Sequence, residues 1–181
     1  MQAVFIDRDG TIGGGHVVYP GDFQLYPRVQ ETMNLLKKAV GHIFSFTNQP
    51  GIARGKARKE DFEEELLGFG FTKAYLCPHD HHDGCECRKP AIGMLLQAAR
   101  EYDLNLESCV VIGDRWTDML AAERAGCMKI LVKTGVGSEA FKKYRNREYI
   151  DEWGKVTPDY IAENFSEAVQ WLLERKRLLE K

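Results

Sequence analysis

An apolar run that ends in two carboxylates constrains this chain more than any other feature. Residues 4–6 are Val-Phe-Ile, and Asp7, Asp9 and Gly10 follow at once. Such a run is typical of a strand buried in a parallel sheet, and a glycine marks the point where the chain leaves it. Open α/β sheets bind their ligands at the carboxyl ends of the strands. Asp7 and Asp9 are therefore predicted to lie where a ligand would bind; an acidic turn is the alternative that this stretch alone leaves open.

Strand-like and helix-like segments alternate along the chain. Strands are predicted at residues 3–6, 43–46, 73–76, 109–112, 129–132 and 160–161. Helices are predicted at residues 28–40, 59–67, 92–102 and 118–125, with an amphipathic helix from residue 166 that ends in a charged, solvated run at 174–181. Residues 136–158 lack a clear period and are expected to form loop and short helix. The alternation predicts βαβ units, and hence an α/β fold of three layers, with a doubly wound parallel sheet between helices, as a single domain over residues 1–181.

Polar groups gather after the predicted strands. They comprise Asp7 with Asp9; Thr47, Asn48 and Gln49; Arg88 and Lys89; and Asp114 with Asp118. Because parallel strands end at the same edge of a sheet, we expect these groups to converge. Carboxylates, a hydroxyl and a lysine at one place are hard to explain by packing, so the sequence predicts a catalytic site.

This set of groups suits the hydrolysis of a phosphate ester. An aspartate can attack phosphorus and form an aspartyl phosphate, which divides one difficult step into two. Mg²⁺ takes oxygen ligands, usually one or two carboxylates with phosphate and water, and it reduces the repulsion between an anionic nucleophile and its substrate. A lysine and a hydroxyl can bind the other phosphoryl oxygens. The residues therefore predict a Mg²⁺-dependent phosphatase.

The motifs resemble, in order, the four motifs of the haloacid dehalogenase (HAD) superfamily. They are DRDGT at residues 7–11, TNQ at 47–49, KP at 89–90, and GD at 113–114 followed by Asp118. The longer strings TNQPGIARG (47–55) and CRKP (87–90) are similar to those of the D-glycero-D-manno-heptose 1,7-bisphosphate phosphatases and, in related form, of the histidinol-phosphate phosphatases. The likeness extends from residue 4 to about residue 137. It implies a HAD-like Rossmannoid fold and an aspartyl-phosphate intermediate.

The resemblance also implies a role for each motif residue. Asp7 is expected to be the nucleophile and a Mg²⁺ ligand. Asp9 is expected to be the general acid and then the general base, and to offer Mg²⁺ its backbone carbonyl, with Asp114 as the third protein ligand. Thr47 and Lys89 are expected to steady the transferred phosphoryl group. The expected substrate contacts are Arg88, Asn48, Gln49, Pro50 and Arg115.

A loop rich in cysteine and histidine precedes the lysine motif. It has a C-x-H…C-x-C arrangement formed by Cys77, His79, Cys85 and Cys87. Structural zinc takes four tetrahedral nitrogen and sulfur ligands, and members of the heptose phosphatase family carry a zinc loop with these ligands. His81 or His82 could replace His79, and a surface loop of reduced thiols is the alternative without a metal. Zn²⁺ in this loop would be structural, and it would fix the direction of the adjoining Arg88 and Lys89.

The intervals between the motifs leave no room for a large cap domain. About 35 residues separate Thr11 from Thr47, and these are taken up by a loop and one helix. The pocket is therefore expected to be open, closed only in part by the loops at 13–20 and 77–87. Two roles are open for Asp118: it could support the site from behind the residues that contact the substrate, or it could cap its own helix.

Three positions depart from the heptose enzymes. Residues 15–18 are Gly-His-Val-Val where an acidic residue and a tyrosine are usual, Pro50 replaces a serine, and Arg115 replaces a lysine. The departures leave the catalytic assignments in place but affect the substrate. A heptose or related sugar bisphosphate is the first expectation, histidinol phosphate the second, and another small phosphomonoester the third.

The composition argues against several classes of partner. A formal net charge of −2 gives no basic face for nucleic acid. No apolar run reaches the ~20 residues of a membrane helix, and the start of the chain lacks the pattern of a signal peptide. Five cysteines, an odd number, favour thiols in a reducing compartment over a disulfide framework. We expect a cytoplasmic monomer that acts on a small phosphorylated metabolite, with no nucleic-acid or membrane partner.

A binding protein that senses phosphate metabolites without turnover is a second class of function. Such a protein could keep the zinc loop and the phosphate-binding groups. Asp7, Asp9, Lys89 and Asp114 are all present, however, and a sensor has little need of Asp9. The sequence therefore favours the enzyme.

Overall fold

Six strands form one parallel sheet, as the alternation of segments predicts. The structure, a computed structural model, describes residues 1–15 and 17–179. Its strands are β1 (Ala3–Ile6), β2 (His42–Asn48), β3 (Lys73–Cys77), β4 (Cys109–Gly113), β5 (Met128–Val132) and β6 (Tyr160–Ala162). They lie in the order β3-β2-β1-β4-β5-β6, and every neighbouring pair is parallel. The strand order reverses between β1 and β4, and doubly wound sheets bind ligands at such a point.

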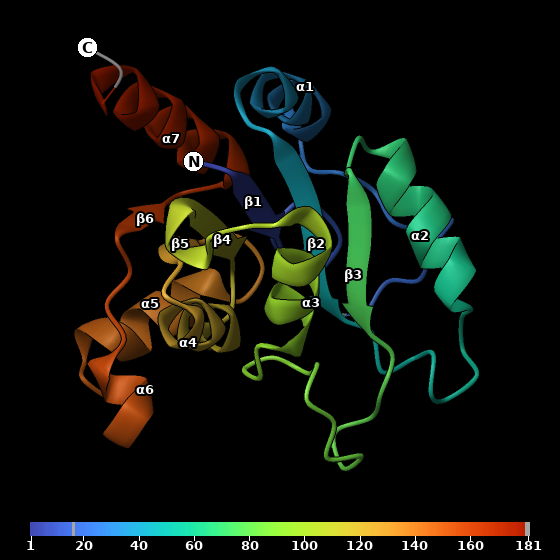
Figure 1. The fold of residues 1–181 in the computed structure, drawn as a ribbon. Helices are drawn as coiled ribbons and strands as arrows, with labels where there is room; N and C mark the ends of the chain where they lie inside the picture. The colour runs from blue at the N-terminus through green and yellow to red at the C-terminus, as the bar shows by residue number, and fades with distance from the viewer. Residues whose placement is uncertain (16, 180–181) are drawn as a thin grey trace.

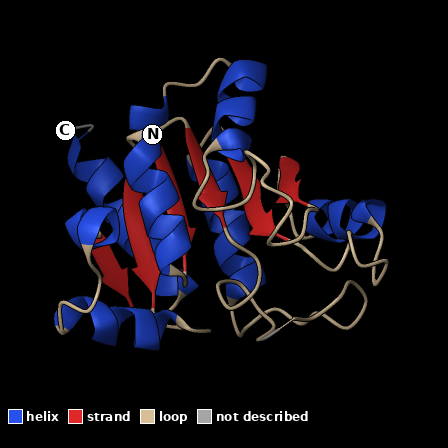
Figure 2. Ribbon diagram, turned by 90° about the horizontal axis from the view of Figure 1, so that it is seen from below, coloured by secondary structure: helices blue, strands red, loops and turns tan. Residues whose placement is uncertain are grey.

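Helices cover both faces of the sheet, which gives the three layers that were predicted (Figure 2). They are α1 (Val29–Ala39), α2 (Lys59–Gly68), α3 (Gly93–Tyr102), α4 (Trp116–Ala125), α5 (Gly137–Arg145), α6 (Asp151–Lys155) and α7 (Phe165–Leu179), with a 3-10 turn at Leu106–Ser108. Helices α1 and α7 contact each other and lie together at the top of Figure 1. The α/β fold class is thus confirmed.

The alternation of side chains in β1 divides the core between the two faces. Val4 and Ile6 belong to a cluster with residues of α1 and α7, whereas Ala3 and Phe5 belong to a cluster with residues of α3 and α4. Successive side chains of a strand point to opposite faces, so an all-apolar strand must be covered on both sides. The first strand is therefore fully buried, and its carboxyl end is fixed by two layers of helices.

A third apolar cluster lies where α4 meets α5 and α6. The ring of Trp116 stacks on Tyr149 with centroids 4.3 Å apart, and its Nε1 donates a hydrogen bond to the carbonyl of Trp153 at 3.0 Å. Helices α5 and α6 fall within residues 136–158, where loop and short helix were expected. Helix α5 is nine residues long but buries only Gly137 and Ala140, so its low apolar content leaves its bounds hard to recognise in the sequence.

Two element boundaries differ from the prediction in ways that matter for the site. Strand β2 continues to Asn48, because Thr47 and Asn48 pair with Leu76 and Cys77 of β3. Helix α4 begins at Trp116, two residues before the predicted start at residue 118. Its first turn is stabilised by the carboxylate of Asp118, which accepts a hydrogen bond from the Arg115 N–H at 2.9 Å. Both polar motifs are thereby held in regular structure.

Some predicted segments include residues that the structure does not describe. His16 in the loop at 13–20 lies outside the described residues, as do residues 180 and 181 of the charged C-terminal run. None of the helices in the described part of the chain has the length and apolar content of a membrane-crossing segment.

Neighbouring leucines of α1 test the assignment of its buried face. Leu36 is 0% exposed and packs in the core, whereas Leu35 is 57% exposed. We expect Leu36→Ala to lower the free energy of unfolding by about 2–5 kcal/mol, because it removes buried methyl groups and leaves a cavity. Leu35→Ala is the control and should cost much less. Equal losses in urea denaturation of the two variants would contradict the packing described here.

Candidate active site

The carboxyl ends of β1, β2 and β4 surround a cavity of about 290 Å³. Nine residues predicted from the sequence line it: Asp7, Asp9, Thr47, Asn48, Gln49, Pro50, Arg88, Lys89 and Arg115. The other lining residues are Gly15, Val17, His81 and Thr117. The first three of these lie in loops that were predicted to border the pocket. Thr117 was missed, and only its position within the fourth motif, between Asp114 and Asp118, could have indicated it.

Lys89 lies at the centre of the buried charges. Its Nζ is 3.0 Å from Asp7 Oδ1 and 2.6 Å from Asp118 Oδ1, and it donates a hydrogen bond to the Phe46 carbonyl at 2.6 Å. Burial by itself lowers the pKa of Lys89, but the charges of Asp118 and Asp7 outweigh that effect and leave the pKa raised. The ammonium group therefore stays charged inside the protein.

Two carboxylates that follow strand ends and a third in the first turn of α4 form a compact cluster. Asp7, Asp114 and Asp118 each offer an oxygen, and these oxygens lie within 4.8 Å of one another. All three residues are at most 4% exposed. Like charges this close are stabilised by a cation or by a proton, and hard oxygen donors are what Mg²⁺ binds. The donor set therefore fits the divalent cation that the motifs predict.

Burial and the crowding of these carboxylates raise the pKa values of Asp114 and Asp118. Burial, followed by the charges of Asp7 and Asp118, raises the pKa of Asp114 to about 7. Burial, with a further contribution from Asp7, raises the pKa of Asp118 to about 6 although Lys89 opposes it. Asp118 also caps α4 through the Arg115 N–H. The two alternatives for Asp118 are thus both present in the geometry: it caps its helix and it pairs with Lys89.

Gly10 allows β1 and β4 to bring their carboxylates together. Its φ is 82°, in the left-handed region, and a Cβ at this position would lie 2.2 Å from Asp114 Oδ2. The glycine that was predicted to end the strand is therefore required both by the turn and by the close approach of the Asp114 carboxylate.

The Asp9 carboxylate lies outside the carboxylate cluster and has partners of its own. Its Oδ1 accepts a hydrogen bond from Arg8 Nη1 at 2.7 Å, and its Oδ2 accepts one from Gln49 Nε2 at 2.6 Å. Burial, together with the charge of Asp7, raises the pKa of Asp9 against the opposing effect of Arg8. Asp9, a carboxyl group with a raised pKa next to Asp7 of the carboxylate cluster, suits acid–base chemistry.

The threonine and asparagine of the second motif have separate contacts. Thr47 Oγ1 accepts a hydrogen bond from Gln49 Nε2 at 3.0 Å. Asn48 Oδ1 accepts the Lys89 backbone N–H at 3.0 Å, and its Nδ2 donates to the Lys89 carbonyl at 3.3 Å. Asn48, predicted as a pocket residue, therefore also holds the backbone that carries Lys89.

The cysteine and histidine loop brings its four predicted ligands together. Cys77, His79, Cys85 and Cys87 offer ligand atoms within 4.8 Å of one another. His79 Nδ1 is 3.2 Å from Cys87 Sγ and 3.6 Å from Cys77 Sγ. Three thiols and an imidazole nitrogen this close together are a donor set that suits Zn²⁺.

His81 faces the pocket instead of the sulfur cluster. Both of its ring nitrogens lie 3.0 Å from Arg88 Nη2, and Arg88 Nη1 donates to the His79 carbonyl at 3.2 Å. The Arg88 guanidinium is therefore attached to the loop by two contacts. The geometry favours His79 over His81 as the ligand.

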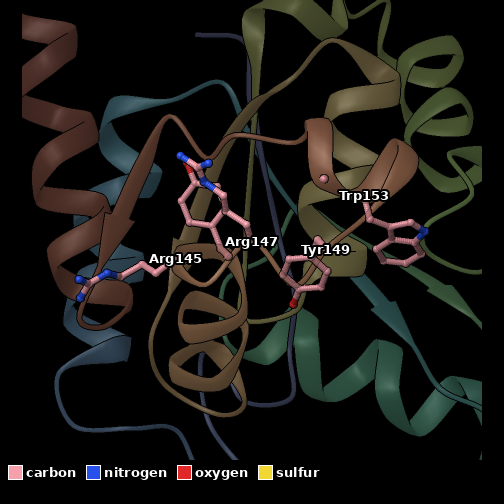
Figure 3. A pocket seen from close by; sticks show the side chains of 6 residues that line it. Arg145, Arg147, Tyr149 and Trp153 are labelled. Carbon is pink, nitrogen blue, oxygen red and sulfur yellow. The ribbon is translucent and has the colours of Figure 1, made fainter.

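A second cavity, of about 410 Å³, contains none of the predicted site residues. It lies at the connection between α5 and α6 and is lined by Tyr144, Arg145, Arg147, Tyr149, Trp153 and Gly154. Figure 3 shows Arg145 extending away from Tyr149 and Trp153. These side chains do not converge on a common point, so this cavity offers no reactive centre.

Comparison with known proteins agrees with this site. A family model described as haloacid dehalogenase-like hydrolase matches residues 14–126, and one described as HAD-hydrolase-like matches residues 86–168. The D-glycero-beta-D-manno-heptose-1,7-bisphosphate 7-phosphatase of Vibrio cholerae is 34% identical over 194 residues, which cover 97% of this chain and 98% of that protein. The protein of the same name from Photorhabdus laumondii is 40% identical over 161 residues, covering 77% and 86%.

A solved structure gives the same result. The D,D-heptose 1,7-bisphosphate phosphatase from B. bronchiseptica, complexed with magnesium and phosphate, aligns with a TM-score of 0.80 at 28% identity and covers 97% of this chain and 99% of that one. The chain therefore belongs to the haloacid dehalogenase-like hydrolases. It is a phosphoric monoester hydrolase, and its similarity to heptose bisphosphate phosphatases agrees with the resemblance of its motifs.

The crowded carboxylates predict an unusual dependence of stability on pH. The pKa of Asp114 is about 7 in the folded chain and about 4 in an unfolded one. The wild type therefore loses stability as the pH rises from about 4 through 7. In the presence of a chelator at pH 8, Asp114→Asn should raise the free energy of unfolding by at least about 1 kcal/mol, or the Tm by about 2–4 °C.

Thermal unfolding at pH 8 and pH 5 checks this expectation. The advantage of Asp114→Asn should shrink at pH 5, where the folded wild type holds the proton. Asp103→Asn, an exposed position on the cap of α3, is the control and should behave like the wild type. A variant that is less stable than the wild type at pH 8 would contradict the electrostatic crowding.

Proposed function

We propose that this chain is a Mg²⁺-dependent phosphatase that hydrolyses a small sugar bisphosphate of the D-glycero-D-manno-heptose 1,7-bisphosphate type. The observation that carries the proposal is the compact set of Asp7, Asp114 and Asp118 oxygens with the Lys89 ammonium 3.0 Å from Asp7. The substrate class is supported by relatives named as heptose bisphosphate phosphatases at 34% and 40% identity.

In the first step, a carboxylate oxygen of Asp7 attacks phosphorus. A bond forms between Asp7 and phosphorus while the bond from phosphorus to the sugar oxygen breaks. Asp9 gives its proton to that leaving oxygen, so the alcohol departs neutral and Asp9 becomes a carboxylate. A raised pKa suits Asp9 to hold this proton near neutral pH.

In the second step, the same Asp9 carboxylate takes a proton from water as the water oxygen attacks phosphorus. The bond between phosphorus and Asp7 breaks, which releases inorganic phosphate and returns Asp7 as a carboxylate. Both steps pass through a transferred phosphoryl group whose oxygens need fixed donors. Lys89 and Thr47, which line the cavity beside Asp7, supply an ammonium and a hydroxyl for this purpose.

Two arginines at the cavity suit the second phosphate of the substrate. Arg88 and Arg115 both line the cavity, and neither is in the buried charge cluster. A guanidinium can bind phosphate through two parallel hydrogen bonds. Asn48, Gln49 and Pro50 complete the lining, and we assign them to contacts with the substrate.

We assign the metal-binding residues from the motif resemblance, supported by the carboxylate cluster and the cysteine and histidine cluster. Asp7 and Asp114 would hold Mg²⁺ with their carboxylates, and Asp9 with its backbone carbonyl. When bound, Mg²⁺ would neutralise negative charge on the phosphoryl group and on Asp7. Zn²⁺ would be held by Cys77, His79, Cys85 and Cys87 in a closed structural site, because four protein ligands leave no open position.

The zinc loop would act on catalysis through its position in the chain. Arg88 and Lys89 directly follow Cys87, so the metal would fix where both side chains point. The remaining predictions are that the chain is a single domain, a monomer and cytoplasmic, and these stay proposals that sedimentation and cell fractionation can check.

A phosphate-release screen tests the function. With Mg²⁺, we expect release from D-glycero-D-manno-heptose 1,7-bisphosphate with kcat/KM above that for histidinol phosphate, and no turnover after chelation. Asp7→Asn should abolish release, because an amide is a far poorer nucleophile for phosphorus, while Asp103→Asn should retain it. Binding of the sugar bisphosphate without release would instead support a sensor.

Removal of two cysteines tests the zinc assignment. Elemental analysis should find Zn²⁺ in the wild type and not in the double variant Cys85→Ser/Cys87→Ser. The double variant should also show a raised KM or no activity, because Arg88 loses its fixed position. His82→Asn, in the same loop, is the control and should keep the metal. Wild-type kinetics from a well-folded double variant would refute the link between loop and pocket.

A further inference from the structure

Arg8, the residue between the two catalytic carboxylates, is fully buried. Arginine is seldom buried in this way unless its charge is paired. Its Nε and Nη2 donate to Glu65 Oε1 on α2 at 2.9 and 2.7 Å, and its Nη1 donates to Asp9 Oδ1 at 2.7 Å. One guanidinium thus connects a carboxylate of the pocket to a carboxylate of a helix 57 residues away in the chain.

Aromatic rings fix the plane of this guanidinium. Its central carbon lies 3.7 Å from the centroid of the Phe23 ring and 5.0 Å from that of Phe62, which is on α2. An arginine can bind an aromatic ring and a carboxylate at the same time. Its planar guanidinium donates hydrogen bonds from its edge while its face stacks on the ring. Arg8 therefore has little freedom to follow Asp9 if Asp9 rotates.

Arg8 and Glu65 also hold the loop at the mouth of the pocket. Arg8 Nη1 also donates to the Val18 carbonyl at 2.8 Å, and the Gly21 N–H donates to Glu65 Oε2 at 3.3 Å. Val17, which precedes this anchored point, lines the cavity. Glu65 thus reaches the site by two routes, through Arg8 to Asp9 and through the loop.

We propose that Glu65 is a positioning residue for catalysis: through Arg8 it sets the orientation in which Asp9 gives its proton to the leaving group. Asp9 has one oxygen held by Arg8 and the other by Gln49. Without Glu65, Arg8 would lose the acceptor of its Nε and Nη2 and keep only Asp9 as a carboxylate partner, so its guanidinium could turn within the plane that the rings fix. This inference rests on the proposed phosphatase function and adds a residue that lies outside the pocket lining.

Leaving-group basicity separates this role from a structural one. A proton donor matters most when the departing oxygen is strongly basic, and least when the departing anion is already stable. Phenyl phosphate and 4-nitrophenyl phosphate have similar shapes but leaving groups of different basicity. Their kcat/KM ratio therefore reports how well Asp9 donates its proton, and it does not depend on the fraction of enzyme that is folded.

The experiment measures this ratio in Glu65→Met and Glu65→Gln with Mg²⁺ present. We expect Glu65→Met to lower kcat/KM for phenyl phosphate about tenfold more than for 4-nitrophenyl phosphate, part of the ~10²–10⁴ that a general acid supplies. Glu65→Gln keeps an acceptor oxygen for Arg8 and should restore most of the wild-type ratio. Asp9→Asn gives the limit of the effect, and Glu64→Met, on the exposed side of the same helix, is the matched control.

Two results would overturn the inference. One is a loss in Glu65→Met that is equal for both substrates, which would mean a structural role only. The other is a ratio in Glu65→Gln as low as that in Glu65→Met. A wild type that releases no phosphate from either substrate would instead refute the proposed function itself, and that outcome is distinct from both.

Discussion

The buried ion pairs of Lys89 organise the whole site. The ammonium group joins Asp7 at the end of β1 to Asp118 in the first turn of α4, at 3.0 and 2.6 Å. These carboxylates are nearly inaccessible to water, so their charges are stabilised by Lys89 or by a cation, and an unpaired charge there would be strongly unfavourable. Asn48 holds the backbone of Lys89 from β2. Two neighbouring strands and a helix therefore have to be assembled before the charges can balance.

Around this centre the two carboxylates of the first motif have different environments. Asp7 belongs to the cluster with Asp114 and Asp118, whereas Asp9 faces Arg8 and Gln49. They are two residues apart in a chain that has just left a strand, so they diverge in space although they are neighbours in sequence. These different environments support different roles, with Asp7 as the nucleophile and Asp9 as the general acid and base. The buried guanidinium of Arg8 accordingly donates to Asp9, whereas from Arg8 the Asp7 carboxylate accepts only the backbone N–H.

The sulfur cluster and the charge cluster are adjacent in the chain. Cys87 ends the first, and Lys89, the centre of the second, follows two residues later. The intervening Arg88 contacts the backbone of His79 and the ring of His81, so it is attached to the loop while it lines the pocket. A loop with few apolar residues cannot fix such a side chain by packing alone. A bound metal can supply the constraint that the missing core does not.

The amino-acid sequence by itself determined where the strands lie in the chain and which residues carry the reacting groups. Apolar runs predicted the strands, and the polar residues that follow them predicted the site residues Asp7, Thr47, Lys89 and Asp114. The motifs and their spacing indicated the family. All of these signals are local in the sequence. Only the tertiary structure decided the partners. The bond from Arg8 to Glu65 spans 57 residues, and the contact of Lys89 with Asp118 depends on α4 starting at Trp116. Short helix was expected around α5, but its bounds were not predicted because so few of its residues are buried. Contacts between distant segments leave no periodicity in a single sequence, and they exist only once the sheet has brought the strand ends together.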